Sequence, residues 1–183
     1  LAGIDVLEAR FGSVPRADRV IHVRYLRVDQ GQEQKVSRIQ VLRRSGPGYC
    51  ALAAGMNVDQ GLDEGPCLGL ERDWPVTLAL VHLVSSTEHS LRVIQTSGRC
   101  GGCGRGAMEQ VSFHHALEDR LTAVFEATTY DVSYQGCPFP PVRHTFGDVR
   151  LTGGFPREIV NTHELVGETE GDPGNPDQEQ CTP

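Results

Sequence analysis

Residues 76–96 read VTLALVHLV-SSTEHS-LRVIQT and carry the strongest fold signal in the chain. The run Val76–Val84 is almost continuously apolar, as expected for a central strand that is covered on both faces. The polar stretch Ser85–Ser90 then turns the chain, and Leu91–Thr96 returns as a second strand. This segment therefore predicts an antiparallel β-hairpin.

Similar signals occur on both sides of this hairpin. Val20–Val28 (VIHVRYLRV) is rich in β-branched and aromatic residues, which favour strands. It is followed by the polar stretch Asp29–Lys35 and by Val36–Leu42, so a hairpin with a long loop is expected. Alternation places Ile21, Val23 and Tyr25 on one face of the first strand. Further strands are expected over Leu121–Ala127, Thr129–Tyr134, Val149–Leu151 and Glu158–Asn161; Met108–Arg120 fits a strand better than a helix, and Ile4–Phe11 fits a strand or a helical turn.

Seven or more strand candidates without strand–helix alternation predict a mainly β fold with little helix. The expected architecture is an antiparallel β-sandwich or barrel with long disulfide-linked loops. The longest of these loops is Gly46–Pro75, which is rich in Gly and Pro and is expected to be an irregular crossover.

The net charge of −7 over 183 residues is unevenly distributed. Residues 167–183 contain five acidic side chains and no Lys or Arg, which leaves −2 for residues 1–166. We therefore expect a single β-rich domain over 1–166 and a flexible, solubilising tail over 167–183. The near-neutral domain lacks the basic face that nucleic-acid binding requires. No run approaches the roughly 20 apolar residues of a membrane span, so no membrane insertion of this segment is expected.

Six cysteines indicate an oxidising compartment, namely secretion or the extracellular face of a membrane protein. The chain begins with Leu1 rather than Met, which suggests a mature product, a trimmed chain or a segment of a longer protein. The predicted pairing is the one in which each disulfide closes the shortest available loop: Cys50–Cys67, Cys100–Cys103 and Cys137–Cys181. Other pairings remain open, because six cysteines allow 15 connectivities.

The pattern Cys100-Gly-Gly-Cys103 has a second interpretation. Two thiolates with this spacing, joined by His115 or its neighbour His114, would supply most of a structural zinc site. In that alternative the protein is an intracellular β-rich protein; otherwise no cofactor and no metal is expected.

The richest candidate binding segment is Gly136–Phe146 (GCPFPPVRHTF). Its prolines restrict the chain, and aromatic and Arg side chains are frequent interface anchors. The binding residues predicted here are Phe139, Pro140, Arg143, His144 and Phe146. Plugging the end of a barrel would explain the phenylalanines equally well.

No strong catalytic motif is present, and in particular no Gly-x-Ser-x-Gly nucleophile elbow. His144 and Asp148 could orient one another as the His–Asp pair of a small hydrolase, which is an alternative function. The sequence thus favours a non-enzymatic extracellular protein-interaction module: a domain of a secreted or cell-surface protein, or a secreted ligand or decoy. Its partner is expected to be another protein.

Overall fold

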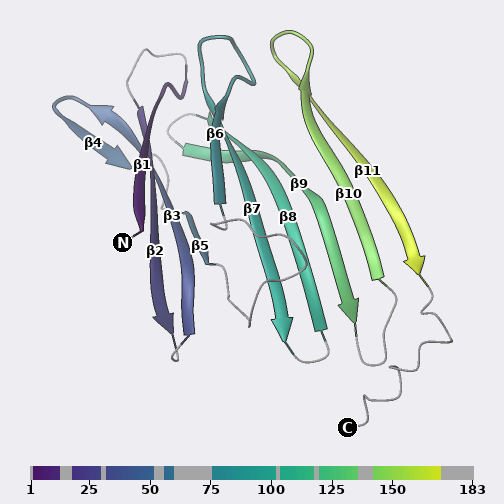
Figure 1. Ribbon diagram of the computed structural model, residues 1–183. Coiled ribbons are helices and arrows are strands. Elements are labelled where there is room, and N and C mark those ends of the chain that lie inside the picture. Colours follow the sequence, from purple (N-terminus) through teal and green to yellow (C-terminus); the bar gives the residue numbers. More distant parts are fainter. Residues whose placement is uncertain are drawn as a thin grey trace.

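Two antiparallel β-sheets form the described part of the chain (Figure 1). The structure is a computed structural model that describes residues 2–12, 18–29, 32–51, 56–59, 76–101, 104–117, 120–135 and 142–169. All regular elements within these ranges are strands, so the expected mainly antiparallel β class with little helix is confirmed.

The first sheet, sheet A, contains the N-terminal strands. Its order is β1 (Gly3–Ala9), β2 (Asp18–Asp29), β3 (Gln32–Ser45) and β4 (Gly48–Ala51), and β5 (Met56–Asp59) also pairs with β3. The predicted β2–β3 hairpin is present, but both strands run further than expected and replace most of the predicted long loop. They extend because polar side chains are tolerated in strands beyond the core, where Leu26 and Val28 are also exposed.

The second sheet, sheet B, has six strands in the order β11-β10-β9-β8-β7-β6. Its elements are β6 (Val76–Val81), β7 (Ser90–Gly101), β8 (Gly104–Leu117), β9 (Arg120–Gln135), β10 (Val142–Thr152) and β11 (Glu158–Thr169). The hairpin predicted from residues 76–96 is β6–β7, with Val76 paired to Gln95 and Val81 to Ser90.

The position of β6 in its sheet differs from the prediction of a central strand. Among the described strands β6 pairs only with β7, so it lies at an edge of sheet B. Its apolar run reflects covered faces: Val76, Leu78 and Leu80 contact one core cluster and Val81 the other. Continuous hydrophobicity reports burial of both faces and carries no information on whether both edges are paired.

Other boundaries differ as well. Residues 48–51 and 56–59 are strands within the segment predicted to be an irregular crossover, and residues 120–135 form one strand where two were expected. β11 continues to Thr169, three residues past the expected domain end, and residues 170–183 lie outside the described ranges.

One core cluster joins the two sheets. It contains residues of β1, β2 and β3 together with residues of β6, β7 and β8, and Phe11 just after β1: Ala9, Phe11, Val20, Ile39, Val41, Val76, Leu91, Val93 and Ala116. The face of sheet A that carries Val20 and Ile39 therefore packs against the face of sheet B that carries Leu91 and Val93. Below, these are called the inner faces.

The opposite face of sheet B has its own core. Val111 and Phe113 of β8 cluster there with Leu83 and with Val149 of β10. β10 pairs with β9 only over Arg143–Phe146, and its later residues pack over the face of the sheet. The turn of the β10–β11 hairpin is tied back through Arg157, whose N–H donates to the carbonyl of Leu83 at 2.7 Å.

β9 curves along its length (Figure 1) and contains two β-bulges. The register between β8 and β9 shifts twice, which leaves Val124 and Thr129 without a cross-strand partner. Thr129 is buried and its hydroxyl donates to the Glu109 carboxylate at 2.9 Å. Gly147 lies just after the residues of β10 that pair with β9, and its backbone approaches the backbone of the bulge at Thr129 closely.

We expect Gly147→Ala to lower the free energy of unfolding by about 1–3 kcal/mol, the usual cost of overpacking. An added Cβ would lie 3.2 Å from Thr129 Cα and 3.3 Å from the carbonyl oxygens of Thr128 and Thr162, all backbone atoms that yield poorly. Urea denaturation measures the change. Gly154→Ala is the matched control, because nothing lies within 4 Å of its added Cβ; equal effects of both substitutions would contradict the close approach.

Candidate functional site

Three polar side chains on the inner face of sheet A have the order of a serine-hydrolase triad. Ser37 Oγ lies 3.1 Å from His22 Nε2, and His22 Nδ1 lies 3.9 Å from Asp5 Oδ2. The strands β1, β2 and β3 position them side by side, with Asp5 directly opposite His22.

Their exposure is the reverse of what catalysis requires. Ser37 is fully buried, whereas the Asp5 side chain is 50% exposed and accepts a 2.8 Å bond from Arg24. A nucleophile must reach substrate, and its orienting acid is normally shielded. Burial, followed by the charge of Arg24, lowers the pKa of His22, while Asp5 opposes this. We interpret the group as a buried polar network that joins three strands.

A second serine–histidine contact lies at the end of sheet B that is nearer to the β6–β7 turn. Ser90 Oγ lies 2.9 Å from His115 Nδ1, and His115 Nε2 lies 3.9 Å from Glu88 Oε2. Ser90 is fully buried too, so its hydroxyl is not available to a substrate. The contact connects the start of β7 to the end of β8.

Histidines also connect the two sheets at this end. The N–H of Arg10, just after β1, donates to His89 Nδ1 at 2.9 Å, and the N–H of His89 donates to the Arg10 carbonyl at 2.6 Å. The His82 ring lies against His89 with centroids 4.8 Å apart. Because Nδ1 accepts a hydrogen bond from the Arg10 N–H, Nδ1 carries no proton and His89 is neutral in this arrangement.

The binding residues predicted from sequence are only partly placed. Phe139 and Pro140 lie outside the described residues. Arg143, His144 and Phe146 belong to β10, where their backbones pair with Ser133, Val132 and Tyr130 of β9, and their side chains are not described. Their role in binding stays a prediction.

The geometry does not support the predicted His144–Asp148 pair. Four residues along a strand separate their Cα atoms by about 13 Å. The Asp148 carboxylate contacts Arg150 instead, at 2.5 Å from its Nε. Sequence proximity was misleading here, because an extended strand separates residues that a loop would bring together.

The residues of the alternative zinc site are also far apart. Cys100 lies near the turn of the β7–β8 hairpin, where its backbone pairs with Arg105, and Cys103 lies outside the described residues. His115 is ten residues further along β8, about 33 Å away along the strand. The register therefore places His114 and His115 at the opposite end of the hairpin from Cys100. Within the described ranges, no cluster of His, Cys, Asp and Glu suited to a metal ion occurs.

Disulfides are not observed in the described part of the chain. Cys50 in β4 is exposed and carries a free thiol, so the predicted bond to Cys67 is not present at its described end. Cys67, Cys103, Cys137 and Cys181 lie outside the described residues, as does the side chain of Cys100.

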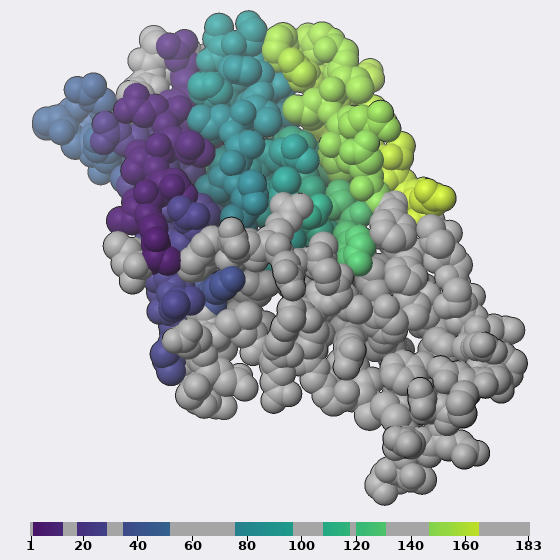
Figure 2. All heavy atoms as spheres, in the orientation of Figure 1, coloured from purple at the N-terminus to yellow at the C-terminus, as the bar shows by residue number. Residues whose placement is uncertain are grey.

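The outer face of sheet A carries a group of apolar side chains that is not recognisable as a site from sequence alone. Ile4 pairs with Val23 and Val6 with Ile21, and Tyr25 follows on the same face. Ile4 is 53% and Val6 52% exposed, while the three β2 residues are half-buried. We call these five residues the outer patch. Figure 2 shows β1, in purple, at the surface of the molecule.

Arginines lie around the outer patch. Arg19, Arg38 and Arg44 share the outer face by strand register, and Arg38 and Arg44 are exposed. Arg19 contacts Glu8 at 3.4 Å and lies over the ring of Tyr49, 5.1 Å from its centroid. An apolar centre with Arg and Tyr at its border has the composition of a protein-binding surface.

Only the β2 residues of this surface could be grouped from the sequence. Alternation correctly grouped Ile21, Val23 and Tyr25, but it did not reveal that this group faces away from sheet B. Ile4 and Val6 were hidden in a segment that also fitted a helical turn.

Helices with the length and hydropathy of a membrane span are absent from the described residues. Comparisons of the chain with protein-family models, with curated proteins and with solved structures each found no match.

We expect acidification below about pH 6.5 to destabilise the fold. The pKa values of His22, His89 and His114 are all lowered, in each case mainly by burial. Between these lowered values and about 6.5 the unfolded chain binds more protons, so stability is complete above pH 6.5 and falls as pH decreases. Denaturation midpoints measured from pH 8 to pH 5 test this.

His89→Asn isolates one contribution, because an Asn side-chain oxygen can accept the Arg10 N–H without titrating. This variant should lose less stability between pH 7 and pH 5 than the native protein does. His163→Gln, at an exposed position of β11, is the control. An unchanged pH dependence in His89→Asn would contradict the role of the Arg10–His89 bond.

Proposed function

We propose that the chain is a non-enzymatic extracellular protein-interaction module, either a domain of a secreted or cell-surface protein or a secreted ligand or decoy. In this proposal the outer patch binds another protein. The partner surface is apolar at its centre and acidic at its border.

The observation that carries the proposal is the exposure of Ile4 and Val6 beside a row of half-buried apolar side chains. Full burial of one such side chain is favourable by about 1.5–3 kcal/mol, so covering the exposed half of Ile4 and of Val6 is worth about 1 kcal/mol each. The β2 residues of the outer patch would add to this. A folded domain gains nothing from leaving these groups in water, which favours a partner that covers them.

The charges around the outer patch determine which partner surface fits. Among the outer-face residues whose side chains the structure describes, Arg19, Arg38 and Arg44 outnumber the acid Glu8. An acidic border on the partner would accelerate encounter and align the two surfaces, whereas a basic border would be repelled. The same preference makes complex formation sensitive to salt.

The proposed module is a β-sandwich in an extracellular, oxidising compartment. We infer a sandwich in which the inner faces of sheets A and B pack together, supported by the core cluster that both sheets share. Disulfides among the cysteines outside the described residues would fit an extracellular protein of this kind.

A photo-crosslinking amino acid at position 6 tests the outer patch. The full chain that carries this crosslinker is applied to intact cells and to culture medium of the producing organism. After irradiation, the labelled protein should form one discrete covalent adduct. Excess native protein should suppress that adduct, whereas excess Ile4→Asp should not. The same crosslinker at position 160, an exposed Val of β11, is the control.

Two results would refute this surface: equal adducts at positions 6 and 160, or equal competition by native protein and Ile4→Asp. Denaturation of the Ile4→Asp protein is measured in parallel to establish that it folds. Mass spectrometry of the native adduct then identifies the partner and its surface charge.

Counting thiols in the unreduced, denatured protein tests the extracellular assignment independently. Alkylation followed by mass spectrometry should label Cys50 and leave at least one pair among the other five cysteines unlabelled. Labelling of all six cysteines would remove the argument for an oxidising compartment without affecting the outer patch.

A further inference from the structure

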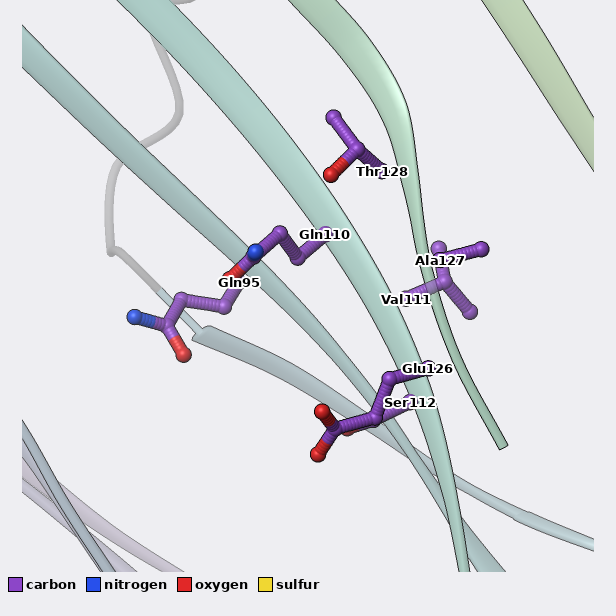
Figure 3. A pocket seen from close by; sticks show the side chains of 7 residues that line it. All are labelled: Gln95, Gln110, Val111, Ser112, Glu126, Ala127 and Thr128. Carbon is purple, nitrogen blue, oxygen red and sulfur yellow. The ribbon is translucent and has the colours of Figure 1, made fainter. Parts of the chain in front are cut away.

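A small polar pocket lies on the inner face of sheet B, apart from the outer patch. It has a volume of about 230 Å³ and is lined by residues of three adjacent strands: Gln95 of β7, Gln110, Val111 and Ser112 of β8, and Glu126, Ala127 and Thr128 of β9. Figure 3 shows the Gln95, Gln110 and Glu126 side chains extending from the same side of the sheet.

Strand register explains why polar groups gather at this point. Gln95, Gln110 and Thr128 form one cross-strand row, and Val93, Ser112 and Glu126 form the next. Val93 belongs to the core shared with sheet A. The inner face thus changes from apolar to polar within a single strand, and the pocket lies at that boundary.

The polar side chains of the pocket are not used to stabilise the described fold. Within the described ranges the side chains of Gln95, Gln110, Glu126 and Thr128 make no hydrogen bond, whereas Ser112 Oγ lies 2.9 Å from His114 Nε2. Gln110 and Glu126 are exposed and Gln95 and Thr128 are half-buried, so the polar groups that line the pocket are accessible to a ligand from solvent.

The pocket carries one formal charge, that of Glu126. No Lys or Arg lines it among the described residues. Glu126 interacts electrostatically with His114, whose pKa is lowered by burial although Glu126 acts in the opposite direction. His114 is therefore neutral at pH 7, and the site favours a cation over an anion.

We propose that this pocket binds a guanidinium group. Glu126 accepts a pair of its N–H bonds, and the side-chain oxygens of Gln95, Gln110 and Thr128 accept others. A guanidinium offers five donors in a planar fork and is weakly hydrated, whereas an ammonium has three donors and is strongly hydrated. Acceptors on three strands match the larger number of donors.

The pocket is smaller than the 300–1,000 Å³ of typical small-molecule sites, so it accommodates a single head group. That group belongs either to a free guanidino compound or to an Arg side chain of a bound peptide. The proposal does not depend on the outer patch, which lies on the opposite face of the other sheet.

Titration of the full-length, ¹⁵N-labelled protein with N-methylguanidine tests the proposal at millimolar concentrations and constant ionic strength. We expect saturable shifts of the Gln95 and Gln110 side-chain amides and of the backbone amides of residues 126–128. N-methylurea, a neutral compound of the same shape, and acetate should give no saturable shift at these groups. Methylammonium should bind more weakly than N-methylguanidine.

Glu126→Gln removes the charge with little change in volume and should weaken binding by about tenfold or more, the loss expected for a hydrogen bond to a charged group. Glu158→Gln, at an exposed position of β11, should leave the affinity unchanged. Denaturation midpoints establish that both variants fold. Non-saturable shifts, equal binding of N-methylurea or of methylammonium, or unchanged affinity in Glu126→Gln would each overturn the proposal.

Comparison with the peptide Ala-Arg-Ala separates the two sources. Tighter binding of the peptide than of N-methylguanidine would identify an Arg side chain of a partner as the ligand. Binding of N-methylguanidine without binding of the peptide would identify a free guanidino compound.

Discussion

The buried carboxylate of Asp18 determines how the N-terminal strands meet the rest of the molecule. Asp18 is fully buried at the first position of β2, where its oxygens accept bonds from the Phe11 N–H at 2.8 Å and from Arg43 Nε at 3.3 Å. Arg43 also donates to the Phe11 carbonyl at 2.6 Å. A buried charge left without its partner costs about 3–5 kcal/mol, a large part of the 5–15 kcal/mol that stabilises a typical domain. These bonds place Phe11 in the core that sheets A and B share.

Both candidate sites follow from that placement. Side chains alternate along a strand, so once Phe11, Val20 and Ile39 face sheet B, Ile4 and Val6 must face solvent. Among the described residues the inner face of sheet B is apolar near this contact, and further along the sheet it carries Gln95, Gln110 and Glu126. The outer patch and the guanidinium pocket are thus two results of one packing arrangement, although each is tested independently.

Local patterns predicted much of the fold and little of the site. The hairpin at residues 76–96 and the pairing of β2 with β3 follow from short-range alternation and turn chemistry, which depend on neighbouring residues only. The edge position of β6 was not predictable in this way, because hydrophobicity reports covered faces and not paired edges. The same limit applies to two of the predicted sites. His144 and Asp148 are close in sequence, but the extended strand β10 separates them. Cys100 and His115 are of the residue types that bind zinc, but they lie at opposite ends of the β7–β8 hairpin.

The amino-acid sequence by itself determined the strand class, the antiparallel hairpins and the grouping of residues such as Ile21, Val23 and Tyr25 on a common face. These properties arise from backbone preferences and a two-residue period, and both are local. Only the tertiary structure decided which face each strand turns to the core and which polar rows converge on a pocket. Those choices depend on contacts between distant residues, above all Asp18 with Phe11 and Arg43, and on the bulges at Val124 and Thr129 in β9.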